Sequence, residues 1–82
     1  MEISLLSLQI GKKAKIKRLV GGYEFQRKLA SLNIRIGKII KIVAAQPFMG
    51  PIVVEINDRR ATLGRGIATR IFVEEENEIS KK

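Results

Sequence analysis

The stretch from Arg59 to Ile71, RRATLGRGIATRI, has the composition best suited to anion binding in this chain, with four arginines and two glycines one residue apart. A glycine-rich basic loop can hold phosphate through its backbone N–H groups. A P-loop, however, requires G-x-x-x-x-G-K-[ST] between a strand and a helix, and this stretch lacks that spacing. We therefore interpret it mainly as a corner of the fold, in which Arg59, Arg60 and Arg65 are candidates for contact with an anionic partner.

Catalytic and metal-binding side chains are scarce. The chain has no His, no Cys and a single Asp, so the usual set of nucleophile, base and orienting group cannot be assembled. The one carboxylate cluster, at Glu74, Glu75, Glu76 and Glu78, is most simply a solvated tail, because ferrous sites favour convergent imidazole and carboxylate ligands. The sequence predicts a protein that is not an enzyme and uses no cofactor, no bound metal and no small-molecule substrate.

The net charge of +8 is unevenly distributed. Residues 1–73 carry 14 Lys and Arg against 4 Asp and Glu, whereas residues 74–82 carry 2 against 4. A basic body favours nucleic acid, an anionic membrane surface or an acidic protein as partner, and charge alone does not choose among them. No segment approaches the ~18 apolar residues of a membrane span, and no basic signal-peptide region precedes the apolar start, so we expect a cytoplasmic protein.

The elements that position these residues begin with an apolar lead-in over residues 3–11, whose Leu5, Leu8 and Ile10 are expected to close one end of the domain. The first clear strand is residues 12–20, where Ala14, Ile16 and the stem of Arg18 alternate with lysines. One face of this strand is therefore expected to be buried and the other cationic.

A short helix follows over residues 23–34, because Phe25, Leu29 and Leu32 recur at helical spacing. Asn33 suits the left-handed position that ends many helices. The exposed face of this helix, with Arg27, Lys28 and Arg35 at its end, is a candidate binding surface.

The second half of the chain predicts strands at residues 38–45, 52–57, 60–63 and 71–75, with a helical turn after Gly64. Small bent sheets of this kind close into barrels, which removes exposed edges. We therefore predict a mainly β domain over residues 1–75, a small barrel of about five strands with one short α-helix and a helical turn before the last strand. A polar tail follows at residues 76–82.

The loop QPFMGP at residues 46–51 is the best candidate for contact with a partner. Phe48 and Met49 stand between prolines, so a rigid turn would hold two apolar side chains outward at low entropic cost. The alternative is that Phe48 folds back and plugs the barrel end. The sequence does not choose between these two arrangements.

Several of these pieces, taken in order, resemble the FeoA family of small SH3-like barrels associated with bacterial and archaeal ferrous iron uptake. The resemblance covers about residues 5–73: the opening leucines and Gly11, the strand AKIKRLV with Gly21-Gly22, the helix ending in LNIRIG, and the run PFMGPIVVEINDRRATLGRGIATRIFV. The last run is the most specific part. Asn33 departs from the pattern, since the family usually has LGI where this chain has LNI.

The resemblance implies an SH3-like barrel that acts as a cytoplasmic accessory protein. It implies interaction with FeoB, the membrane ferrous iron transporter with a GTPase domain, and regulation of its activity or assembly. Similar domains occur at the end of DtxR-type repressors, but this chain has no room for a helix-turn-helix domain. A small basic nucleic-acid-binding barrel remains the alternative, although no aromatic stacking surface is evident. Self-association of the chain through an open strand edge or the apolar loop also remains open.

Overall fold

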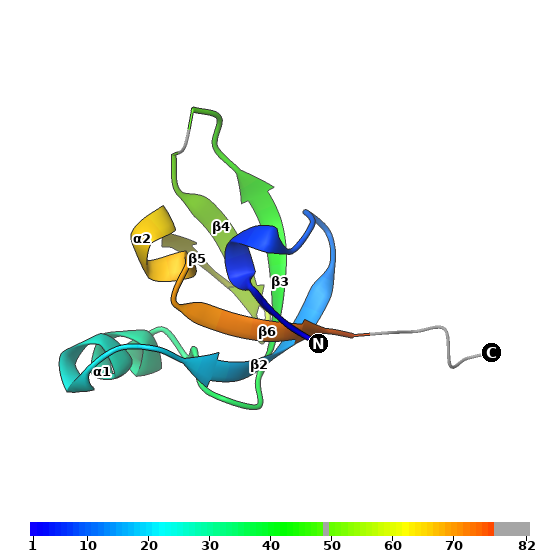
Figure 1. Ribbon diagram of the computed structural model, residues 1–82. Coiled ribbons are helices and arrows are strands. Elements are labelled where there is room, and N and C mark those ends of the chain that lie inside the picture. Colours follow the sequence, from blue (N-terminus) through cyan, green and yellow to red (C-terminus); the bar gives the residue numbers. More distant parts are fainter. Residues whose placement is uncertain (49, 77–82) are drawn as a thin grey trace.

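One antiparallel sheet organises the structure, a computed structural model that describes residues 1–48 and 50–76 (Figure 1). The elements in chain order are β1 (Glu2–Ser4), a 3-10 turn η1 (Leu5–Ser7), β2 (Lys13–Leu19), α1 (Tyr23–Ser31), β3 (Ile39–Ala45), β4 (Ile52–Ile56), β5 (Arg59–Leu63), α2 (Arg65–Ala68) and β6 (Ile71–Glu75). The order of the strands across the sheet is β1-β6-β2-β3-β4-β5. The mainly β class, the short helix and the helical turn before the last strand agree with the prediction, but the described residues form six strands rather than about five.

The additional strand is β1, which pairs antiparallel with residues 72–74 of β6. Three residues are too few to show an alternating pattern, so the sequence did not predict this strand. Its conformation is held by backbone pairing with β6. Leu5 and Leu8 after it are buried, as predicted. The prediction for Ile10 is wrong: its side chain is 59% exposed, because the chain turns away at Gly11, where φ is 91°.

A β-bulge in β2 changes which side chains face the core. Ile16 is paired with Val73 of β6, but the next pair is Arg18 with Phe72, so Lys17 is the extra residue. A bulge shifts the alternation of the strand by one. The prediction that the stem of Arg18 faces inward is therefore wrong; Arg18 lies outside, its guanidinium carbon 4.5 Å from the centre of the Phe72 ring.

The core is aliphatic and lies inside the bend of the sheet. Its buried side chains are Leu5, Leu8, Ala14, Ile16, Leu29, Ile34, Ile40, Ile42, Ile52, Val54, Ile56, Leu63, Ala68, Ile71 and Val73. Phe25 and Ile67 are partly buried against it. Ala68 and Ile67 of α2, which is the helical turn predicted after Gly64, thus pack in and against the core.

The end of α1 fixes how the helix joins the sheet. Asn33 has φ 67°, its N–H donates to the Ala30 carbonyl, and the N–H of Ile34 donates to the Leu29 carbonyl, each at 2.9 Å. This is a Schellman motif, and Leu29 and Ile34, which its longer hydrogen bond joins, are both buried in the core. The predicted left-handed conformation of Asn33 is confirmed. The rest of α1 projects from one side of the sheet (Figure 1).

Candidate protein-binding surface

The tip of the β3–β4 loop presents Phe48 to solvent, with its side chain 98% exposed. Phe48 has φ 58°, the N–H of Gly50 donates to the Pro47 carbonyl at 3.2 Å, and the N–H of Gln46 donates to the Pro51 carbonyl at 3.0 Å. A backbone closed in this way holds its side chains with few conformations to lose. Of the two arrangements left open by the sequence, Phe48 therefore adopts the outward one and does not plug the barrel.

Arg65 ties this loop to the short helix α2. Its Nε donates to the Gly50 carbonyl at 3.0 Å, and the residue is partly buried. Arg65 was predicted as a partner contact; the structure places it at the base of the loop, where it stabilises the turn that carries Phe48. Met49 lies outside the described residues.

Arg59 and Arg60 follow a tight turn between β4 and β5. Asn57 and Asp58 have φ 53° and 66°, as in a two-residue type I′ hairpin turn. In the hairpin register Arg59 lies opposite Ile56 and Arg60 lies opposite Glu55. Because successive side chains of a strand point to opposite faces, the two arginines lie on different sides of β5.

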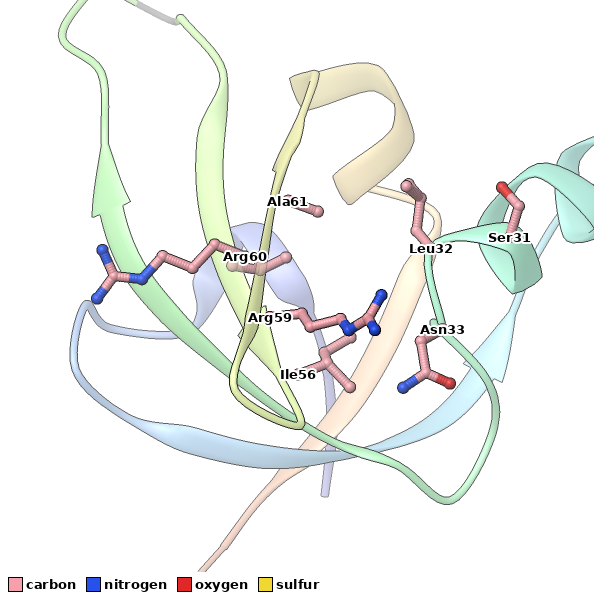
Figure 2. Close-up of a pocket in the computed structure, with 8 residues that line it drawn as sticks. Ser31, Leu32, Asn33, Ile56, Arg59, Arg60 and Ala61 are labelled. Carbon is pink, nitrogen blue, oxygen red and sulfur yellow. The ribbon is translucent and has the colours of Figure 1, made fainter.

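A cavity of about 160 Å³ lies between β5, β4 and the C-terminal end of α1. Figure 2 shows Arg59 extending toward Asn33 and Arg60 extending away from it, with Ala61 and Leu32 facing each other across the opening. The cavity is lined by Ser31, Leu32, Asn33, Val54, Ile56, Arg59, Arg60 and Ala61. Val54 and Ile56 are buried, so the floor is apolar while the mouth is polar and cationic.

The helix surface is a separate place on the molecule. Arg27 and Lys28 are exposed on α1, and the guanidinium carbon of Arg27 lies 5.9 Å from the centre of the Tyr23 ring. Figure 1 shows α1 at the lower left of the view, apart from the β3–β4 loop at the top. The predicted contact residues thus fall into three regions: the loop with Phe48 and Arg65, the cavity with Arg59 and Arg60, and the exposed face of α1.

Ion pairs concentrate on the side of the sheet formed by β1, β6 and β2. The Nζ atoms of Lys12 and Lys17 lie 3.6 and 3.7 Å from carboxylate oxygens of Glu75 and Glu74. The N-terminal ammonium is 3.2 Å from Glu74. This ammonium, and to a smaller degree that of Lys17, hold the pKa of the Glu74 carboxyl below its ordinary value of 4.5.

These pairs correct the prediction for the carboxylate cluster. Glu74 and Glu75 are exposed, as expected, but they are strand residues with cationic partners and not part of a free tail. Glu76 follows the strand, and Glu78 lies outside the described residues. Within residues 1–48 and 50–76, no group of three or more His, Cys, Asp and Glu is arranged to hold a metal ion. Over the same residues, no helix has the length and apolarity to cross a membrane.

The sequence did not reveal the cavity, because its walls come from α1, β4 and β5. Only Asn33, Arg59 and Arg60 among its lining residues carried a signal, from backbone conformation and charge. Ser31 and Leu32 look like ordinary residues of a helix end. Their role as a wall depends on where the Schellman turn places the helix relative to β5.

Known proteins are similar to this chain in both sequence and fold. The model of the FeoA domain family matches residues 3–75. A protein of Methanocaldococcus jannaschii named "Putative Fe(2+) transport protein A" is 29% identical over 65 residues, which cover 79% of this chain and 77% of that one.

Two solved structures are similar along most of this chain. One is a crystal structure of an iron uptake regulatory protein (FeoA), 28% identical, with a TM-score of 0.84 over 93% of this chain and 99% of that one. The other is a solution structure of iron(II) transport protein A from Clostridium thermocellum, 37% identical, with a TM-score of 0.85 over 89% of this chain and 45% of that one. These likenesses confirm the predicted SH3-like fold, and the family match over residues 3–75 shows that the chain belongs to the FeoA domain family.

Proposed function

We propose that this protein is a noncatalytic cytoplasmic accessory of ferrous iron uptake that binds and regulates a FeoB-type membrane iron transporter. The observation that carries the proposal is the FeoA domain match over residues 3–75, together with relatives named for Fe(2+) transport and iron uptake regulation. In this proposal iron is the cargo of the partner, and GTP hydrolysis belongs to the partner as well.

The loop at Phe48 supports binding of another protein. Buried aromatic side chains are frequent anchors of protein interfaces, and a rigid turn lowers the entropy lost when such an anchor is buried. Phe48 is almost fully exposed, and the turn beneath it is closed by backbone hydrogen bonds and by Arg65. We therefore assign Phe48 as the anchor and Arg65 as the residue that positions it.

Capture of membrane partners, with this protein as bait, tests the proposal directly. We expect the FeoB-type transporter of the same cell to be recovered, and removal of this protein to change ferrous iron uptake by that transporter. If the folded protein neither recovers the transporter nor changes its activity, the proposal is wrong.

Phe48→Ala, alone and combined with Met49→Ala, locates the interface. We expect each variant to weaken capture by about ten-fold or more, as for loss of an aromatic anchor, with the free energy of unfolding changed by less than about 0.5 kcal/mol. Ile10→Ala is the matched control, because Ile10 is also exposed and apolar but lies in another loop. Equal capture by Phe48→Ala and by the unmodified protein would remove the loop from the interface.

Nucleic acid is the alternative partner, which the basic charge favours. Lys12, which precedes β2, and Lys17 within β2 already face carboxylates of β6. The rings of Phe25 and Phe72 lie against Arg70 and Arg18, at 5.4 and 4.5 Å, which leaves neither ring as a free stacking platform. Sub-micromolar RNA or DNA affinity at physiological salt, lost on reversing the charges of the β2 lysines, would favour this alternative over the transporter.

A further inference from the structure

The free edge of β5 has unused backbone hydrogen-bonding groups. In the described residues β5 pairs only with β4, and it is the last strand of the sheet. In a hairpin with a two-residue turn, the residues next to the turn exchange both hydrogen bonds, and every second residue then points its N–H and C=O outward. Arg59 lies next to the turn, so Arg60 and Thr62 direct their backbone groups to the free edge.

The opposite edge of the sheet is less suited to pairing. It is formed by β1, which has three residues and runs directly into the 3-10 turn η1. β5 has five residues and lies beside the cavity bounded by Leu32 and Asn33. An extended segment beside β5 could therefore hydrogen-bond to the outward backbone groups of Arg60 and Thr62 and place one side chain in the cavity.

A row of charged side chains crosses the outer face of the sheet and ends at this edge. In the strand registers Lys13 lies opposite Lys41, Lys41 opposite Glu55, and Glu55 opposite Arg60. From β3 to β5 the charges thus alternate as positive, negative, positive. Opposite charges on neighbouring strands stabilise a sheet, so the position that continues this row beyond Arg60 favours a carboxylate.

The same charges disfavour a second copy of this chain as the occupant. Two β5 strands paired antiparallel along their full length would place Arg60 of each copy opposite Thr62 of the other. The two Arg60 side chains would then be diagonal neighbours on one face, where like charges repel. Charged residues at sheet edges commonly prevent such self-pairing. An acidic segment removes this repulsion instead of adding to it.

We propose that the free edge of β5 binds an extended acidic segment of another protein by strand addition. The segment hydrogen-bonds to the backbone of Arg60 and Thr62. Its outward carboxylates face Arg60, and one aliphatic side chain on the other face enters the cavity floored by Val54 and Ile56. The proposal concerns the chemistry of the segment and holds whichever protein supplies it, so it does not depend on the transporter.

A capped seven-residue peptide that alternates glutamate and valine is the probe, with an otherwise identical lysine–valine peptide as its comparison. Both are titrated into the purified full chain to about 1 mM, a range that detects weak binding. Amide chemical shifts and hydrogen exchange are followed by NMR. We expect the acidic peptide to shift the amides of Arg60 and Thr62 and to slow their exchange, and the lysine peptide to have no such effect.

Arg60→Glu tests the charge and Thr62→Pro tests the backbone donor, since proline is tolerated on the open side of an edge strand. We expect Arg60→Glu to weaken binding of the acidic peptide about ten-fold or more and to favour the lysine peptide. Thr62→Pro, which keeps every charge, should weaken binding similarly. Arg27→Glu on α1 makes the same change of charge away from the edge and should have little effect.

Three results would overturn the proposal. One is no binding of the acidic peptide at about 1 mM to a chain whose amide spectrum shows it folded. Another is an equal loss of binding in Arg27→Glu and Arg60→Glu, which would indicate non-specific attraction to net charge. The third is slowed exchange of the Arg60 and Thr62 amides that depends on protein concentration without peptide, which would make a second copy the occupant. The transporter capture experiment can succeed or fail independently of all three.

Discussion

The two sides of the sheet differ in how their charges are compensated. On the side of β1, β6 and β2, the cations Lys12, Lys17 and Arg18 each pair with a carboxylate, at 3.1 to 3.7 Å. On the side of β3 to β5, Arg59 and Arg60 make no ion pair with any residue of 1–48 or 50–76. Both sides cover the same aliphatic core.

This difference shows that surface ion pairs are not what keeps the second side folded. Exposed ion pairs contribute little to stability in general, whereas burial of aliphatic side chains contributes most of it. β5 is held by its inner face and by its pairing with β4, so Arg60 on its outer face is not needed to hold the strand. The first side holds several of its cations in ion pairs, whereas on the second side Glu55 lies opposite both Lys41 and Arg60 in the strand registers without forming one with either residue.

The largest expected effect separates the two faces of β5. Leu63 is fully buried, so Leu63→Ala should lower the free energy of unfolding by about 2–5 kcal/mol. Arg60→Ala, three residues earlier on the same strand, should change it by less than about 0.5 kcal/mol. Urea unfolding followed by circular dichroism measures both. A large loss in Arg60→Ala would mean that this arginine has a structural partner and is not held for binding.

Arg65 provides an intermediate effect, because it is the arginine on the second side that has a structural hydrogen bond. Arg65→Ala removes the donor to the Gly50 carbonyl and should destabilise the fold by about 1 kcal/mol. It should also speed hydrogen exchange of the Gly50 amide, which the loop turn protects. Arg27→Ala, an exposed arginine on α1, serves as the control. Unchanged exchange at Gly50 would show that the loop keeps its shape without Arg65.

The smallest expected effect is on the paired side and depends on pH. The folded state lowers the pKa of Glu74, so this carboxylate contributes stability above its unfolded pKa, and that contribution is lost as the pH falls through the folded pKa. Stability should therefore decrease as the pH drops below about 4.5. Glu74→Gln should make this decrease shallower with little change at neutral pH. An identical acid profile in both proteins would show that the pairs with the N-terminus and Lys17 do not persist in solution.

Most of the fold could be predicted because its patterns are local. The alternation in β2, β4, β5 and β6, the helical spacing of Phe25 and Leu29, and the conformational preference of Asn33 depend on near neighbours in sequence. Errors in the strands depend on partners distant in sequence, because β1 requires the backbone of β6 and the outward position of Arg18 requires the bulge at Lys17. The exposure of Ile10 goes with the turn at Gly11, whose N–H donates to the Ile42 carbonyl at 2.7 Å.

The sequence indicated which residues of the candidate sites could bind a partner, but not where these residues lie in the fold. Phe48 stood out because prolines flank it, and its outward position became clear only from the closed turn and the bond from Arg65. Arg59 and Arg60 stood out by charge alone. Their separation by strand alternation, with one toward the cavity and the other on the outer face, requires the pairing of β5 with β4.

The sequence by itself determined a small, basic, aliphatic β domain and the order of its elements, because composition and short-range periodicity specify strand and helix directly. It also carried the ordered motifs of the FeoA domain. Only the tertiary structure decided which cations remain without carboxylate partners, which strand edge stays open and where a cavity forms. These properties depend on the relative positions of segments that are far apart along the chain, and no local pattern encodes them.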